Sequence, residues 1–158
     1  MSRLVRLISV RERRGAASVE MAMVAPILIL MLFGIIEFGL LFHSLMTLNN
    51  ATREGARCAS VGSLPVEINA RIDGAAGRLD RDQLTVYLES RKWTGGYWSA
   101  WTPIVADGDR NSAEPGSQIR VRTAYNHKFI VGNLFSRFAD DQVNNTKLVK
   151  ASVIMRRE

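Results

Sequence analysis

Cysteine and histidine are nearly absent from this chain of 158 residues, which has one cysteine and two histidines. A single cysteine excludes a disulfide within the chain and any zinc site built from several thiolates. The sequence also has no nucleophile motif around a serine, no phosphate-binding glycine loop and no set of metal ligands. We therefore expect a protein that is not an enzyme, with no catalytic residue, no cofactor and no metal.

Lysine and arginine are absent from residues 21–48, where Glu37 is the only carboxylate. A membrane-spanning helix needs about 20 mostly apolar residues. The Val, Ile, Leu and Phe residues of this stretch favour insertion by about 4–9 kcal/mol in total, whereas one acidic side chain costs about 2.5–3.5 kcal/mol at the bilayer centre. The apolar region of a secretory signal peptide would be shorter, about 7–15 residues. The sequence thus predicts a transmembrane helix over residues 16–48.

Positive charge is concentrated ahead of the apolar stretch, because residues 1–15 hold five arginines and one glutamate. Basic flanks of a membrane helix stay in the cytoplasm, so we expect the N-terminus inside and everything after residue 48 outside. The whole chain has a formal charge of +6, and most of the excess lies in this leader. The basic balance therefore reports topology, and nucleic acid is not expected as a partner.

A junction typical of type IV prepilins lies between Gly15 and Ala16. The basic leader, residues 1–15, ends in glycine, and Glu20 follows at the start of the apolar helix. Cleavage after Gly15 would leave a new ammonium group on Ala16. An unpaired carboxylate in a membrane helix is costly, so Glu20 is expected to pair with that group on a neighbouring subunit and set the axial register. The alternative is an interfacial residue at the positive end of the helix dipole.

Residues 20–62 resemble the TadE-like family of tight-adherence (Flp, type IVc) pilus proteins. Three stretches carry the resemblance: RGAASVE ending at Glu20, GIIEFG around Glu37, and NATREGAR, the most diagnostic. The last contains the family motif Arg53, Glu54, Gly55 and Arg57. Farther along, the resemblance is only architectural, apart from a closing strand that ends in Met155-Arg156-Arg157. Met21 departs from the family, which usually has an aromatic residue there.

The resemblance implies a minor pseudopilin that takes part in pilus assembly, priming or tip formation. The implied partners are the membrane, a prepilin peptidase, other pseudopilins, the major pilin and the inner-membrane assembly platform, with no small-molecule substrate. The implied location is the bacterial inner membrane, in a single pass with a periplasmic C-terminal domain, or the pilus itself. Glu37 is expected to contact a partner within the membrane, or else to reach the outer interface.

The exported part is predicted to be an α+β, pilin-like head. Residues 49–62 continue the long helix, and residues 63–158 form the head, with a short helix beginning at Pro65. Alternating apolar residues predict strands over 84–88 and 119–125 and a closing strand over 148–155, with 98–105 as a candidate fourth strand. Because runs of strands follow the helices, the expected sheet is small and antiparallel.

An aromatic cluster provides the candidate partner surface of this head: Trp93, Tyr97, Trp98 and Trp101. It is predicted to bind a partner subunit or glycan, or to be the aromatic side of a hairpin packed on the helix, which we favour. The first interpretation leads to an alternative function, a single-pass membrane-anchored binding module (adhesin or sensor) with an extracytoplasmic ligand-binding head.

Three further stretches give weaker signals. Residues 107–111 begin like a calcium loop, but Ser112 and Gln118 stand where glycine and glutamate are needed, so a solvated turn is expected. Cys58 is expected to pack a helix rather than to form an intermolecular bridge. Residues 129–138 are apolar without clean alternation, and are either a loop folded on the sheet or a surface that touches other subunits.

Overall fold

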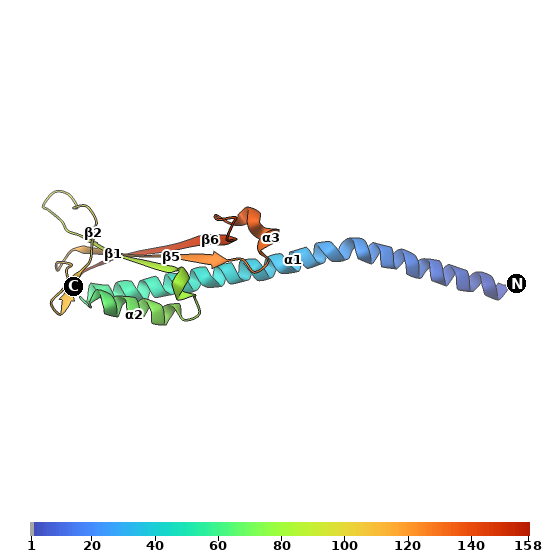
Figure 1. Ribbon diagram of the computed structural model, residues 1–158, viewed down its shortest axis with the longest axis horizontal. Coiled ribbons are helices and arrows are strands. Elements are labelled where there is room, and N and C mark those ends of the chain that lie inside the picture. The colour runs from blue at the N-terminus through green and yellow to red at the C-terminus, as the bar shows by residue number, and fades with distance from the viewer. Residues whose placement is uncertain (1) are drawn as a thin grey trace. The chain divides into compact units, whose positions relative to one another are not determined.

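The computed structural model describes residues 2–158, without the side chains of residues 2–14 and Asn133. It divides into two units, Met1–Gly39 and Leu40–Glu158. The elements, the larger of which are labelled in Figure 1, are α1 (Ser2–Ser60), α2 (Pro65–Ala76), η1 (Arg81–Gln83), β1 (Leu84–Arg91), β2 (Thr102–Pro103), β3 (Ala106–Asp107), β4 (Arg110–Asn111), β5 (Gln118–Lys128), α3 (Gly132–Phe135), η2 (Ser136–Phe138) and β6 (Thr146–Arg156).

The first unit contains only the N-terminal part of α1, up to Gly39. From Gly15 onward this helix is long and apolar enough to cross a membrane, with a mean hydropathy of 2.5 over its most apolar 18 residues. Only 6% of that window is buried. A core helix of a soluble domain would bury such a surface, so the helix is suited to anchoring the chain in a membrane by a single pass. The predicted basic leader falls largely on residues whose side chains lie outside the described structure.

In the second unit, the last turns of α1 lie between α2 and the sheet (Figure 1). Small residues on this part of α1 allow close packing on both sides. The buried core joins α1, α2, the sheet and the loops after β2 and β4, and comprises Leu48, Ala51, Ala56, Ala59, Ile68, Ile72, Ala76, Leu79, Ile104, Ala113, Ile119, Val121, Val149 and Ala151. Cys58 packs against this core, which confirms the packing interpretation for the single thiol.

The main sheet is antiparallel, with strand order β2-β1-β5-β6. The central strand, β5, alternates between buried residues such as Ile119 and Val121 and more exposed residues such as Arg120 and Arg122. The period-2 pattern that predicted this strand therefore also divides the sheet into a core face and an outer face. The predicted α+β fold class, with a long helix, a short helix and a small antiparallel sheet, is confirmed.

Two buried polar contacts fix the position of α1 on β5. The Thr52 and Thr123 hydroxyls are 2.6 Å apart, and the Ser44 hydroxyl is 3.1 Å from His127 Nδ1. The two helix residues are separated by eight positions, about 12 Å along a helix. The two strand residues are separated by four positions, about 13 Å along a strand. Because the spacing of the two residues along α1 matches that along β5, both contacts can form at once. Together they fix the register of the helix on the strand.

One detail differs from the sequence-based expectation. The fourth strand is only β2, because Pro103 has no N–H to extend a ladder. In the stretch 129–138, Phe129 and Phe135 are buried with ring centroids 6.5 Å apart, as expected for a loop folded on the rest of the head, whereas Ile130 and Phe138 are exposed; contact with other subunits stays a prediction.

Candidate functional site

The predicted processing junction lies on α1 in the first unit. Gly15, Ala16 and Glu20 are all exposed, and a Cβ at Gly15 would meet nothing within 4 Å. The junction is therefore helical in the uncleaved chain, and a peptidase that needs an extended substrate must first unwind this turn. Cleavage after Gly15 and registration by Glu20 stay predictions.

Glu37 lies farther along the same helix and is 1% exposed. A buried carboxylate is costly unless it is compensated by a partner. The predicted contact with a partner protein is not tested by this placement and stays a prediction.

Gly55, within the Arg-Glu-Gly-Ala-Arg motif, is the point of closest approach between α1 and α2. A Cβ at this position would overlap the Ile72 side chain, coming within 2.6 Å of its Cδ1 atom. Since Ile68 and Ile72 are fully buried, the glycine has a packing function. The glycine of the motif thus allows the short helix to lie against the long one.

The charged residues of the motif lie on the surface beside this contact. Glu54 accepts a hydrogen bond from Arg57 at 3.2 Å and lies 3.9 Å from Nε of Arg71 on α2, while Arg53 is exposed. Exposed pairs of this kind contribute at most about 1 kcal/mol. Glu54 therefore links the two helices at the surface, and Arg53 and Arg57 both face solvent.

Asn111 caps the C-terminal end of α1. Its Nδ2 atom donates hydrogen bonds to the carbonyl oxygens of Ala59 (3.0 Å) and Ser63 (2.9 Å), and its backbone N–H donates to Gly62 O (3.0 Å). Its Oδ1 atom accepts from the Ala113 N–H, and the residue is only 4% exposed. The last carbonyls of a helix have no partner within it, so this amide satisfies groups that burial would otherwise leave unpaired.

Arg157, directly after β6, holds the same helix end. Its Nη1 atom donates to Ser60 O at 3.0 Å, and the Glu158 N–H donates to the same oxygen at 3.0 Å. The backbone of Arg157 is fixed by hydrogen bonds with Ser117 and Gly116. At 7% exposure, the guanidinium is one of the few buried charges in the described structure. A cation near a helix C-terminus is also favoured by the helix dipole.

The aromatic cluster lies on a hairpin that continues β1 beyond the sheet. Trp93 pairs with Trp98 across the hairpin, and their rings meet edge to face with centroids 5.3 Å apart. The turn contains Gly95 at φ +86°, a conformation that favours glycine. Trp93 and Tyr97 are 54% and 70% exposed, so the tip of the hairpin is open to solvent.

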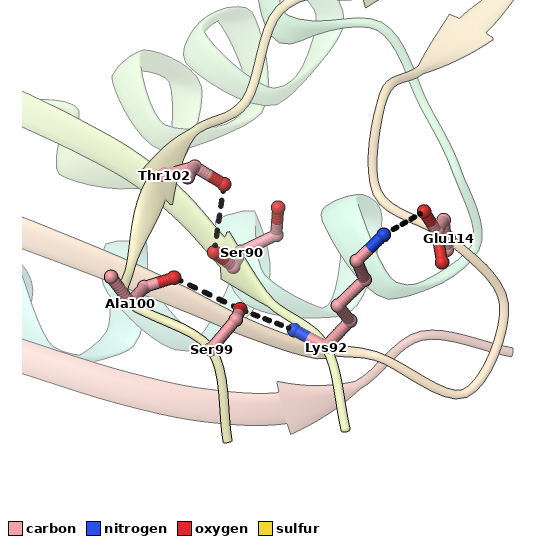
Figure 2. Close-up of polar contacts among 6 residues, drawn as sticks. All are labelled: Ser90, Lys92, Ser99, Ala100, Thr102 and Glu114. Atoms are coloured by element: carbon pink, nitrogen blue, oxygen red, sulfur yellow. Dashed lines mark hydrogen bonds and ion pairs between the residues drawn. The ribbon is translucent and has the colours of Figure 1, made fainter. Parts of the chain in front are cut away.

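Backbone and side-chain hydrogen bonds fix the base of this hairpin (Figure 2). The Lys92 N–H donates to the Ser99 hydroxyl at 3.0 Å, and the Ser99 N–H donates to Lys92 O at 2.9 Å. Thr102 donates to Ser90 O, and the Lys92 ammonium lies 3.1 Å from a Glu114 carboxylate oxygen. Hydrogen bonds and an ion pair therefore hold the base of the hairpin whose aromatic tip is exposed.

The comparison with protein families adds one decisive observation. Residues 15–57 match the family of TadE-like proteins. Over this segment, the chain is similar to TadE-like proteins. The match contains the Gly15–Ala16 junction, the apolar part of α1 and the motif at Gly55 that packs α1 on α2. No curated protein and no solved structure matches the chain.

The remainder of the chain, beyond the matched segment, carries a basic outer face on its sheet. Glu89 is the carboxylate at its centre and pairs with Arg120 (2.8 Å) and Arg122 (3.0 Å). Arg120 and Arg91 also lie over the Trp101 ring, 4.0 and 4.5 Å from its centroid. The favoured interpretation, that the aromatic cluster packs on the helix, is thus wrong for Trp101, since Arg120 faces away from the buried core.

An acidic loop lies between η2 and β6 and borders a cavity of about 650 Å³. Lys147 and the Leu148 N–H donate to Asp140, and these bonds hold its pKa below the usual range. Asn144 donates to Asp141 through its side chain and backbone, which likewise lowers the pKa of Asp141. Within the described residues, no group of three His, Cys, Asp or Glu side chains is placed to hold a metal ion.

Asn111 and Arg157 are the structural residues whose contacts the sequence did not predict. The stretch 107–111 is a solvated turn as expected over Asp107 to Arg110, all exposed, but the prediction is wrong for the buried Asn111. A sequence offers no local sign that an asparagine beyond a turn will reach a helix 52 positions away. The only available sign for Arg157 is its place at the end of the closing strand.

Proposed function

We propose that the chain is a minor pseudopilin of a tight-adherence (type IVc) pilus machine. It is anchored in the bacterial inner membrane by the apolar part of α1 and takes part in pilus assembly, priming or tip formation. The observation that carries this proposal is the TadE-like match over residues 15–57, which covers the prepilin-type junction and the membrane-spanning segment together. A single-pass membrane protein associated with a pilus accounts for all three features.

The topology of the proposal follows from charge. The arginine-rich leader stays in the cytoplasm, so the part of the chain after residue 48 lies in the periplasm. A prepilin peptidase then acts on the Gly15–Ala16 bond from the cytoplasmic side. Glu20 pairs with the new amine of a neighbouring subunit, and Glu37 contacts the inner-membrane assembly platform or another pseudopilin. Other pseudopilins and the major pilin are the remaining partners.

Intact-mass measurement tests the proposal most directly. The full-length protein is expressed with and without a prepilin peptidase, extracted from membranes and weighed. We expect the full chain without the peptidase and residues 16–158 with it. A Gly15→Val variant serves as control and should remain full length in both samples, because its Cβ blocks the close backbone approach that glycine permits. A full-length wild-type chain in both samples would overturn processing.

A further inference from the structure

A shallow groove of about 440 Å³ lies between the aromatic hairpin and the ends of β5 and β6. Trp93 and Trp98 form one wall, and Gln118, Ile154 and Arg156 form the other. Small-ligand sites in proteins usually have volumes of about 300–1,000 Å³ and combine aromatic walls with a few polar groups. The groove therefore has the size and lining of a site for one or two sugar rings.

The two tryptophans meet edge to face, with 66° between their ring planes. This geometry leaves the faces of the rings pointing in different directions, and Trp93 is more than half exposed. Flat aromatic faces pack well against the C–H faces of a sugar ring, because both surfaces are apolar and rigid. Arg91 supports the Trp98 ring, with its guanidinium carbon 5.1 Å from the ring centroid. Its Nε atom also donates a hydrogen bond to Gln118 Oε1 at 2.8 Å.

The charge of the groove lining indicates which kind of sugar fits. The residues that line the groove include no carboxylate. Arg156 is exposed, and no ion pair of the described part of the chain involves it. On the same outer face, Glu89 is already shared by Arg120 and Arg122, so it does not neutralise Arg156. A guanidinium binds a carboxylate through two parallel hydrogen bonds, which makes an anionic ligand the matching one.

We propose that this groove binds an acidic sugar residue of a polysaccharide, with Trp93 and Trp98 against the sugar ring and Arg156 on its carboxylate. An acidic peptide would use Arg156 but leave the two tryptophan faces without a matching surface. This binding is separate from the proposed role in pilus assembly, which needs only α1 and the packed head. Loss of sugar binding would therefore leave assembly unchanged.

The test uses the full-length protein in detergent micelles and three immobilised polymers: polygalacturonate, neutral dextran and poly-glutamate. We expect binding to polygalacturonate, none to dextran, and about tenfold weaker binding to poly-glutamate, which can pair with Arg156 but lacks the sugar face that packs on the two tryptophans. Binding to none of the polymers, equal binding to polygalacturonate and dextran, or equal binding to polygalacturonate and poly-glutamate overturns the proposal.

Variants locate the site. Arg156→Gln and Trp93→Ala should each weaken polygalacturonate binding about tenfold or more, with unchanged circular dichroism. Arg156→Lys keeps the charge but loses the two-pronged geometry, so its affinity should fall between those of the wild type and Arg156→Gln. Lys150→Gln removes one charge from the exposed side of the same strand, outside the groove, and should bind as the wild type does. An equal loss in Lys150→Gln and Arg156→Gln overturns the groove as the site.

Discussion

Arg157 lies directly against Gly62, two residues beyond the end of α1. A Cβ at position 62 would come within 2.8 Å of the Arg157 Cζ atom, and Gly62 has a φ of +92°, which L-residues rarely adopt. The missing side chain at this turn is what allows a guanidinium from the far end of the sheet to reach Ser60 O. The turn after α1 and the residue that follows β6 are thus sterically complementary.

Gly62→Ala should destabilise the head by roughly 1–3 kcal/mol, because the new methyl group combines backbone strain with overlap on Arg157. Thermal unfolding of the detergent-solubilised protein, followed by circular dichroism, measures the effect. Gly74→Ala is the matched control: a Cβ there meets nothing within 4 Å, and replacing a helical glycine should stabilise by about 0.5–1 kcal/mol. Equal effects of the two substitutions would contradict the assignment.

Asn111→Asp should cost about 1–3 kcal/mol, because it replaces the amide donor facing the Ala59 and Ser63 carbonyls with an acceptor. The shape of the side chain is nearly unchanged, so a loss of stability reports the hydrogen bonds rather than packing. Asp109→Asn, on the exposed turn of the same hairpin, should change stability by no more than about 0.5 kcal/mol. Chemical denaturation of both variants gives the comparison, and an unaffected Asn111→Asp would exclude a capping role.

Gly55→Ala should separate α1 from α2, because its methyl group overlaps Ile72. Removing the obstructing atoms with Ile72→Ala also destabilises, by about 2–5 kcal/mol, since it opens a cavity. The double variant should then be more stable than the sum of the two single losses predicts, by roughly 0.5–3 kcal/mol. Strict additivity in a double-mutant cycle would show that the two positions are not in contact.

Glu20→Ala should insert into the membrane as the wild type does but fail to enter a complex with pilus partners, because the carboxylate that pairs with a neighbouring amine is lost. Co-purification with the other pseudopilins, normalised to the amount in the membrane fraction, measures the defect. Glu20→Asp retains the charge and should recover part of the association. Normal co-purification of Glu20→Ala would refute the registration role.

The acidic loop should loosen at low pH. The folded pKa values of Asp140 and Asp141 are lowered by the groups that donate to them. The stability that the two carboxylates contribute is therefore complete above about pH 4 and is lost as the pH falls through the lower folded values. Hydrogen exchange of residues 139–146, corrected for the intrinsic rate, should increase in that range. In Asp141→Asn, this dependence should be reduced.

The elements that local patterns define were predictable from the sequence. Neighbouring residues alone show the apolar alternation of β1, β5 and β6. They also show the proline that begins α2. The contacts that finish the fold are not, because they join distant positions: Asn111 reaches Ala59 across 52 positions, and Arg157 reaches Ser60 across 97. The partners of Trp101 likewise depend on the register of β1 against β5, which places Arg91 and Arg120 beneath one ring.

The capped end of α1 has a mechanical consequence. The carbonyls of Ala59 and Ser60 are held at once by Asn111 from β4 and by Arg157 beyond β6. A force along the axis of α1 therefore acts on the β3–β4 hairpin and on β6 together. The hydrogen bonds of Asn111 and Arg157 share this force instead of breaking one after another. Within the second unit, the end of α1 is thus held by two separate elements at once, so that the turn after Ser60 is protected from both sides.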